Sequence, residues 1–443
     1  MTRCESASFL SLLTLLLWLS SAEASHFRFG SISWAPTPGF SSNTITFTFR
    51  LAFRRSFSNS YYCDENTKSQ RTLIGYGDSW TATCSDPYNP QCNTYLADTG
   101  FYCTDFSSNE DWSMGENNFT YTFPSNNLEW TVSYTSCCWI SLARYGNGQW
   151  LVSGEIDLTP RSDNGKINSS PVTRSLAIYR FQEGCPKEIR ITVEDPDGDT
   201  VKCRWASDAE SSIPSDSFPY GLLEETNCVL KYGGGNGTAG TYAVTLTLED
   251  FPAGTTNFNN VRPFSAAGLQ FLVIINGQSG PCDDIPVFTD STPQDGECSE
   301  IQIGSAYTAV IEVQLADIAK HVVEIATSSP PGMQITSLRY HQGIYYRNVT
   351  WYPNQYQFGQ NLFCFQAVDS NGLQSSLHCV TILVGLSNTP QVILGSQSPS
   401  KPISEIGPGS IWWSIHFDQV VRNEVFWERP IFYTATMENV NES

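Results

Sequence analysis

Closely spaced carboxylates are the feature of this sequence best suited to chemistry. The segment Asp195-Pro-Asp-Gly-Asp199 places three acids at alternate positions. Such a turn suits Ca²⁺, which takes about six to eight oxygen ligands in proteins, and Glu194 or Asp250 would add carboxylates if the loops meet. The alternative is an ordinary hairpin turn, because Asp-Gly forms turns without any metal. If calcium binds here, the candidate ligands are Asp195, Asp197, Asp199 and Asp250.

Catalytic motifs, by contrast, are missing. None of the five histidines lies in a His-Glu-x-x-His frame, and the chain has neither a Gly-x-Ser-x-Gly elbow nor a phosphate-binding loop. A triad or acid pair gathered from distant residues leaves no local signature, so a secreted hydrolase stays open as an alternative. We expect a protein that is not an enzyme, has no catalytic residues and needs no cofactor, with calcium as the one candidate.

The first two dozen residues determine how the cysteines are interpreted. Residues 9–19 form an apolar run after Arg3, and Ala22-Glu-Ala24 has the small-x-small pattern at which signal peptidase cuts. A membrane-spanning helix needs about 20 apolar residues, and no later stretch is that long. The polar C-terminus, Met437–Ser443, lacks the hydrophobic tail of a lipid-anchor signal. We therefore expect residues 1–24 to be a signal peptide and the mature protein to be secreted, extracellular and soluble.

Cleavage would leave thirteen of the fourteen cysteines, because Cys4 lies in the signal peptide. An odd number in an oxidising compartment indicates several disulfides and one thiol that is free or pairs with another chain. Cys84 and Cys92 bracket a short, turn-rich loop, whereas a bridge between the adjacent Cys137 and Cys138 is not expected because it strains the peptide unit. The candidate disulfide cysteines are Cys63, Cys84, Cys92, Cys103, Cys137, Cys138, Cys185, Cys203, Cys228, Cys282, Cys298, Cys364 and Cys379.

Asn-x-Ser/Thr sequons fit the same compartment and predict a glycoprotein. The five candidate acceptors are Asn118, Asn168, Asn236, Asn348 and Asn441. Removal of residues 1–24 takes away Arg3, Glu5 and Glu23 and leaves a formal charge of −19. Because this charge repels phosphate backbones, nucleic acids are excluded as partners, and it favours solubility and association with cations.

Composition predicts an all-β protein. Aromatic residues make up 13% of the chain and charged residues 15%, and branched and aromatic side chains pack well on a pleated surface. The stretch 315–327 is the best helix-like pattern, with a pair of strands as its alternative. In the first region Trp34, Trp80, Trp112, Trp130, Trp139 and Trp150 offer either a glycan-binding face or a filled core.

Three β-rich regions follow the signal peptide. Residues 25–175 form a Cys-rich N-terminal β-domain, in which the apolar residues between Ile45 and Phe53 alternate with the period of a strand. Residues 176–288 contain strand-like runs at the density of an immunoglobulin-like β-sandwich. Residues 289–386 repeat that module, because a cysteine precedes both Glu188-Ile-Arg-Ile191 and Glu300-Ile-Gln-Ile303.

The end of the third region predicts a specific hairpin. Asn371-Gly372 is a strong tight-turn pair, and a turn centred there places Cys364 opposite Cys379 and within reach of a disulfide. The competing pairing ties one of them to an earlier cysteine. Residues 387–443 then form a Pro/Ser/Gly linker and an incomplete β segment around Ile411–Phe417. Either this segment docks on the third domain or the chain is a shortened form of a longer protein.

Residues 176–386 resemble repeats of large modular extracellular proteins. Val193-Glu-Asp-Pro-Asp-Gly-Asp-Thr-Val201 resembles the first turn of cadherin-like and polycystic-kidney-disease-like repeats. Pro330–Met333, Val349-Thr-Trp-Tyr-Pro353 and Ala367–Gly372 are similar to successive motifs of immunoglobulin-type repeats of surface proteins. The resemblance implies β-sandwiches that act as spacers or adhesive modules, often with calcium bound in their loops.

These observations predict a non-enzymatic adhesion or extracellular-matrix protein. Its partners would be an extracellular protein or glycan, and its odd cysteine would be available for an intermolecular disulfide. A soluble lectin-like or ligand-binding protein that uses the aromatic N-terminal domain is the alternative from a different class.

Overall fold

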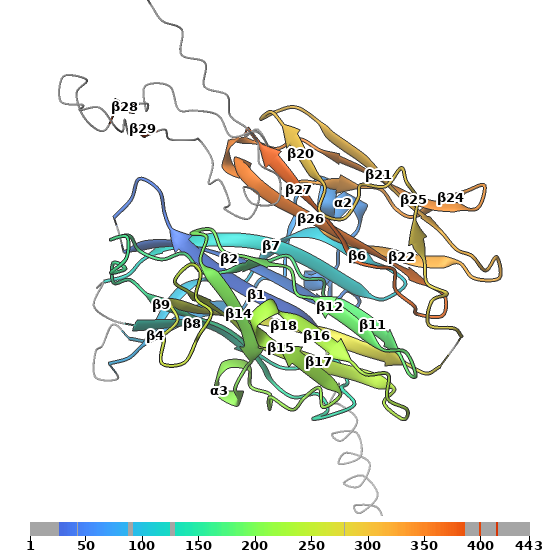
Figure 1. Ribbon diagram of the computed structural model, residues 1–443, viewed down its shortest axis with the longest axis horizontal. Helices are drawn as coiled ribbons and strands as arrows, with labels where there is room; N and C mark the ends of the chain where they lie inside the picture. Colours follow the sequence, from blue (N-terminus) through green and yellow to red (C-terminus); the bar gives the residue numbers. More distant parts are fainter. Residues whose placement is uncertain are drawn as a thin grey trace, which may run out of the picture. The chain divides into compact units, whose positions relative to one another are not determined.

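The computed structural model describes residues 26–41, 43–86, 92–124, 129–278 and 280–385, together with the short strands β28 (Ser398–Pro399) and β29 (Trp413–Ser414). The expected signal peptide and the sequon at Asn441 lie outside these residues. Within them the fold is all-β, as predicted (Figure 1), and the helices are only one or two turns long. They are η1 (Asn59–Tyr61), α2 (Glu65–Ser69), α3 (Asp208–Ser211), η2 (Glu225–Asn227) and η3 (Gln355–Gln357).

The N-terminal strands form two packed layers. One has the order β3-β6-β7-β2-β1 and the other β9-β8-β4-β5. The alternation predicted around β2 is confirmed, since its five odd-numbered residues from Ile45 to Phe53 are at most 1% exposed. Trp80 of β4 packs against Phe49 and Phe119 of the facing layer. The bounds are β1 (Phe27–Pro36), β2 (Thr44–Arg54), β3 (Leu73–Ile74), β4 (Ser79–Cys84), β5 (Thr94–Asp98), β6 (Phe101–Ser107), β7 (Trp112–Thr122), β8 (Glu129–Ser136) and β9 (Trp150–Asp157).

The next strands form a second sandwich. β11, β18, β17 and β14 make one sheet, and β12, β16 and β15 make the sheet that covers it. The two sheets are joined by the Cys203–Cys228 disulfide and by the stacked rings of Phe181 and Tyr232. The bounds are β10 (Val172–Thr173), β11 (Ile178–Gln182), β12 (Lys187–Arg190), β13 (Val193–Glu194), β14 (Thr200–Trp205), β15 (Gly221–Glu224), β16 (Val229–Tyr232), β17 (Gly240–Phe251) and β18 (Ser265–Asn276).

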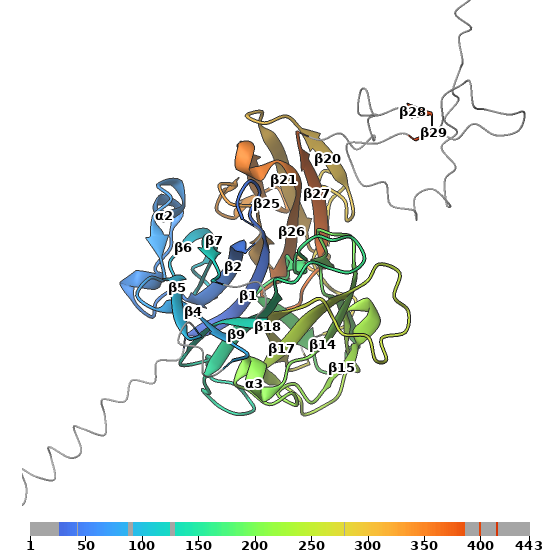
Figure 2. The same ribbon diagram turned by 90° about the vertical axis from the view of Figure 1, so that its left-hand side faces the viewer.

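Strand β18 joins these two sandwiches into one sheet of 13 strands. One of its edges pairs in turn with β9 at 266–267, with β1 at 269–270 and with β11 at 272–276, while its other edge pairs with β17. Figures 1 and 2 show β18 between β9 and β17. The two regions divided at residue 175 therefore share a sheet, and their buried residues form one continuous core.

The third set of strands forms two further sheets. One contains β19, β21, β25, β23 and β24, and the other contains β22, β26, β27 and β20. Phe288 of β19 packs edge-on against Phe365 of β26, 5.2 Å between ring centres. Residues 315–327 form neither a helix nor a pair of strands: a loop over 315–321 follows β21, and the single strand β22 begins at Val322. The bounds are β19 (Val287–Phe288), β20 (Cys298–Ile301), β21 (Tyr307–Gln314), β22 (Val322–Ser328), β23 (Gln334–Ile335), β24 (Arg339–His341), β25 (Ile344–Trp351), β26 (Gly359–Asp369) and β27 (His378–Val384).

The chain clusters into two compact units. The larger contains the described parts of Met1–Glu297, Ala306–Tyr352 and Leu362–Val380, and the smaller contains Cys298–Ser305, Pro353–Asn361 and the described residues from Thr381 onward. In the smaller unit β20 pairs in parallel with residues 381–384 of β27.

Buried polar groups hold β22 and β25 against the N-terminal strands within the larger unit. Asp105 of β6 is fully buried and accepts hydrogen bonds from Arg347 of β25 and Thr327 of β22. Lys68 of α2 lies 4.0 Å from the same carboxylate. A buried charge is tolerated only when it is paired and hydrogen-bonded, so these residues fix how the strands meet.

Six disulfides occur among the described residues. They are Cys63–Cys103, Cys84–Cys92, Cys137–Cys138, Cys185–Cys282, Cys203–Cys228 and Cys364–Cys379. The expectation that Cys137 and Cys138 do not bridge each other is wrong: their Cα atoms are 3.1 Å apart, and the peptide between them is cis. Cys298, which the sequence placed among the disulfide candidates, is instead an exposed free thiol.

The predicted hairpin differs from the structure in one detail. Cys364 and Cys379 are bridged, but Val368 pairs with Gln374 beside the turn, one residue away from the register of a two-residue Asn-Gly turn. Asp369 causes the shift, because its carboxylate accepts hydrogen bonds from the backbone of Asn371 and Leu373 and so sets a longer turn.

Candidate functional site

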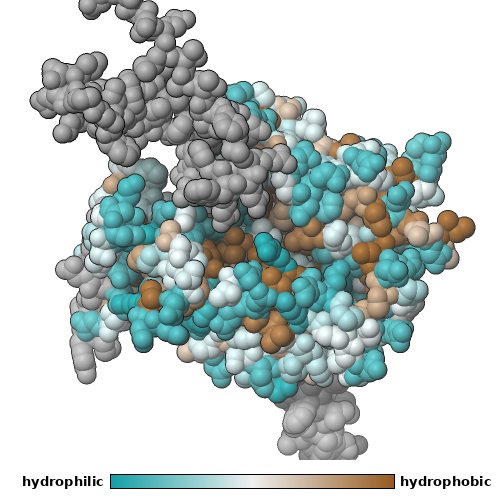
Figure 3. Space-filling model, viewed as in Figure 1, coloured by the Kyte–Doolittle hydropathy of each residue, from teal (hydrophilic) through white to brown (hydrophobic). Residues whose placement is uncertain are grey.

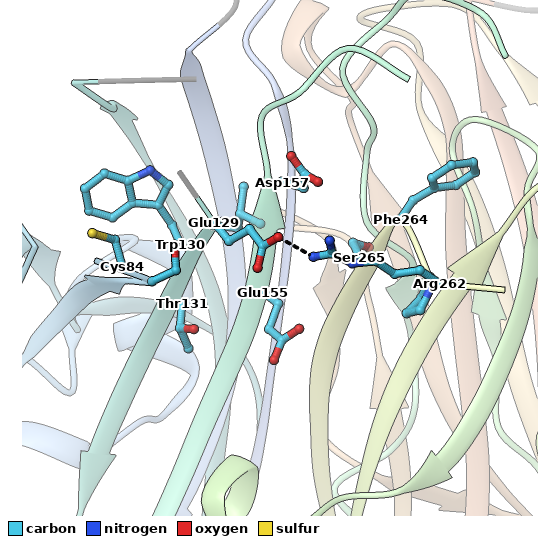
Figure 4. A pocket seen from close by; sticks show the side chains of 12 residues that line it. Cys84, Glu129, Trp130, Thr131, Glu155, Asp157, Arg262, Phe264 and Ser265 are labelled. Atoms are coloured by element: carbon cyan, nitrogen blue, oxygen red, sulfur yellow. Dashed lines mark hydrogen bonds and ion pairs between the residues drawn. The ribbon is translucent and has the colours of Figure 1, made fainter. Parts of the chain in front are cut away.

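A groove of about 310 Å³ opens beside β8, β9 and the segment 262–265 that leads into β18. Figure 4 shows Glu129, Glu155 and Asp157 on one side of it and Arg262 and Phe264 on the other. The acids come from paired strands, because Glu129 is opposite Asp157 in the β8–β9 ladder. The long β18 brings its preceding loop to these strands by pairing with β9 at Ala266 and Ala267.

The charge of the groove is unbalanced. Arg262 donates to Glu129 at 2.6 Å, and both side chains are more than half exposed, so this pair contributes little stability. Neither Glu155 nor Asp157 has a salt bridge among the described residues. Burial and the nearby Glu210 raise the pKa of Glu155. Three carboxylates therefore face one guanidinium, and the groove attracts cationic groups.

The acidic turn predicted from the sequence lies directly behind one wall of this groove. Carboxylate oxygens of Asp195, Asp199 and Asp250 lie within 4.8 Å of one another. Asp250 accepts hydrogen bonds from the backbone and hydroxyl of Ser265, which lines the groove. The guanidinium of Arg161 lies 3.9 Å from the ring centre of Phe264, another lining residue. The turn and the groove thus share one supporting wall.

The structure brings three of the four proposed calcium ligands together. The fourth, Asp197, instead accepts a hydrogen bond from the backbone of Ser169 at 2.6 Å. Glu194 lies in β13, opposite Val172, and is not in the trio. The Asp195 Oδ2 atom is buried without a hydrogen-bond partner among the described residues, which leaves one oxygen available to a cation.

The local electrostatics combine acids that are hard to ionise with a competing cation. Burial raises the pKa of Asp195 to about 7 and that of Asp250 to about 6, and Asp199 repels both. Arg161 forms a forked pair with Asp199 and also binds Asp163. A metal would replace protons on the first two acids and would share Asp199 with Arg161. Sequence reasoning missed Arg161, because it lies 38 residues from Asp199 and no local pattern links them.

The other proposed sites differ in accessibility. Asn118 and Asn236 are exposed and Asn348 is partly buried, but Asn168 is only 2% exposed. Asn168 accepts from Arg161 and donates to Asp250, so it braces the acidic turn. Of the two alternatives for the six tryptophans of the first region, the filled core is confirmed, because all six are at most 4% exposed. On the face shown in Figure 3, hydrophobic residues lie in separate groups among hydrophilic ones.

None of the helices in the described part of the chain has the length and hydrophobicity needed to cross a membrane.

Comparison with known proteins points to one group of relatives. The family described as integrin beta-like protein A-E, N-terminal, matches residues 28–159. Integrin beta-like protein A of Dictyostelium discoideum is 23% identical over 389 residues. That alignment covers 82% of this chain but only 19% of the relative, so the chain spans about a fifth of the relative's length.

Solved structures add only weak likenesses. An endo-fucoidan hydrolase of glycoside hydrolase family 107 covers 68% of this chain and 38% of its own, at 12% identity and a TM-score of 0.18. The two N-terminal immunoglobulin domains of a Drosophila receptor protein tyrosine phosphatase cover 49% of this chain and 100% of theirs, at 11% identity and a TM-score of 0.20. At such TM-scores neither likeness carries a functional argument. What the chain resembles in sequence is the N-terminal part of integrin beta-like proteins.

Proposed function

We propose that this chain is a secreted, non-enzymatic, adhesion-type protein that binds an extracellular protein through the acidic groove. The groove carries the proposal, because its volume of about 310 Å³ holds a side chain and its carboxylates outnumber its cation. Similarity to integrin beta-like proteins over 82% of the chain supports the adhesion class. Six disulfides among the described residues support an oxidising, extracellular location.

The chemistry of the groove favours a lysine or arginine side chain on the partner. A guanidinium has several N–H donors and can form more than one hydrogen bond to carboxylates. Glu155 and Asp157 both line the groove and would accept such bonds. Sulfated or sialylated glycans carry negative charge and would be repelled. The lectin-like alternative also loses the tryptophans as a platform for sugar rings, since all six of the first region are buried.

Calorimetric titration tests the groove with a capped Gly-Arg-Gly-Arg-Gly peptide and residues 25–443 as the secreted protein. We expect binding that weakens as salt rises, and a loss of about tenfold in affinity for the Glu155→Gln/Asp157→Asn variant. Glu188→Gln, at an exposed acid on β12, should bind as the wild type does. Equal binding by both variants, or equal binding of the corresponding glutamate peptide, would refute the groove as the ligand site.

We also propose that Asp195, Asp199 and Asp250 bind calcium, as the cadherin-like resemblance implies. The orphaned Asp195 oxygen and the closeness of the three carboxylates support this assignment. Because Ser265 and Phe264 connect the trio to the groove, bound calcium would brace the wall against which a ligand packs. Titration of the groove peptide with and without Ca²⁺ measures this coupling, and identical affinities would contradict it.

A further inference from the structure

A small apolar patch marks the place where the described part of the third set of strands ends. Ile303 is 46% exposed and Phe358 is 58% exposed. Both side chains lie over Gly385, since a Cβ there would be 2.8 Å from Phe358 Cδ2 and 3.7 Å from Ile303 Cδ1. The Gly385 backbone is fixed in turn by its hydrogen bond to the Ile301 carbonyl, 2.8 Å. These residues all belong to the smaller unit.

The chain beyond Gly385 contains a segment that needs such a surface. Its apolar residues Ile411, Trp413, Ile415 and Phe417 alternate, which gives a strand one apolar face. The described strands β28 and β29 pair antiparallel with each other, Pro399 opposite Trp413. A hairpin of two strands is at best marginally stable in water unless it packs on something else.

We infer that residues 411–417 dock with this apolar face on the patch formed by Ile303 and Phe358. The occupant follows from the course of the chain, because the segment 386–443 directly follows Gly385, the residue beneath the patch. A tether of about 25 residues holds the segment at millimolar effective concentration, which favours the same chain over a second copy. Docking covers two exposed apolar side chains and removes the aggregation hazard of the Trp412-Trp413 strand.

Hydrogen exchange of residues 25–443, followed by mass spectrometry at several protein concentrations, tests the inference. We expect amides of 411–417 to be protected in the wild type at every concentration. Phe358→Ser and Trp413→Ser should each lower that protection by about tenfold or more. Trp412→Ser is the matched control, because the alternation of the sequence would put residue 412 on the opposite face of a strand, and its loss should leave protection unchanged.

Three outcomes would overturn the inference. One is exchange of 411–417 in the wild type at the rate of an unstructured peptide. Another is unchanged protection in Phe358→Ser, which would place the segment elsewhere. The third is protection that appears only at concentrations where light scattering shows dimers, because the occupant would then be a second copy. None of these outcomes depends on the acidic groove.

Discussion

Glu324 of β22 is a buried acid whose replacement tests how the polar contacts of the larger unit respond to pH. The residue is 8% exposed, and its Oε1 atom has no hydrogen-bond partner among the described residues. The pKa of Glu324 is influenced by four neighbouring groups: Asp105 and Ser107 of β6, Glu110, and Arg180 of β11. Arg347 and Lys68 are both paired with Asp105. Arg180 is itself paired with Glu110, so Glu324 has no cation of its own.

The cost of the Glu324 charge follows from its titration. Burial raises the pKa of Glu324 from 4.5 to about 7, an effect that Arg180 opposes and Glu110 reinforces. The folded protein thus holds a proton between pH 4.5 and 7 that the unfolded chain releases, so stability falls as pH rises through this window. At about 1.4 kcal/mol per pKa unit, the ionised side chain costs at most about 3 kcal/mol above pH 7.

Glu324→Gln keeps the shape of the side chain and removes its charge at every pH. Differential scanning calorimetry should show little change at pH 4.5 and a melting temperature raised by roughly 3–6 °C at pH 8. Glu188→Gln on β12 serves as an exposed control and should match the wild type at both pH values. A Glu324→Gln variant that is less stable at pH 8, or whose difference from wild type is the same at both pH values, would refute the reasoning.

Three further predictions test the sheet, the acidic turn and the odd cysteine. Gly268→Ala should destabilise the protein by about 1–3 kcal/mol in calorimetry, because its Cβ would lie 2.7 Å from the carbonyl oxygen of Ser153, between β18 and β9. Gly277→Ala is the control and should not change stability, because a Cβ there meets nothing within 4 Å. Calcium should bind more tightly at pH 8 than at pH 5.5 in titration calorimetry, because it must displace the protons that burial keeps on Asp195 by raising its pKa to about 7; equal affinities would contradict the site. Burial and Glu300 raise the pKa of Cys298, so iodoacetamide should react with the Cys298 thiol at pH 7 more slowly than it reacts with the thiol of glutathione. Cys298→Ser should abolish any disulfide-linked dimer on a non-reducing gel.

Local patterns predicted local structure well. The alternation from Ile45 to Phe53 identified β2 and its buried face, because a strand on a core must point every second residue inward. The Asn-Gly pair likewise led to the correct Cys364–Cys379 bridge, although the observed turn is longer and its register differs by one residue. Each of these inferences needed only residues close together in the chain.

Features built from distant segments left no such trace. Strand β18 lies within the strand-like runs predicted between residues 176 and 288, but nothing in its sequence specified that one edge would pair with β9, β1 and β11 in succession. The acidic groove had no signature either, because Glu129 and Arg262 are 133 residues apart. Carboxylates that are far apart in the sequence can be recognised as one site only once the positions of their strands in the fold are known.

Buried charges connect segments that the sequence assigned to separate domains. Asp105 is 242 residues from Arg347, and neither could be left buried without the other. Gln374 similarly accepts from the Arg180 backbone and donates to the Ile178 carbonyl, so it occupies the remaining edge of β11. Modules that merely followed one another would keep such groups in water. A partner bound at the proposed groove would therefore contact the same compact unit that holds β18, β22 and β25.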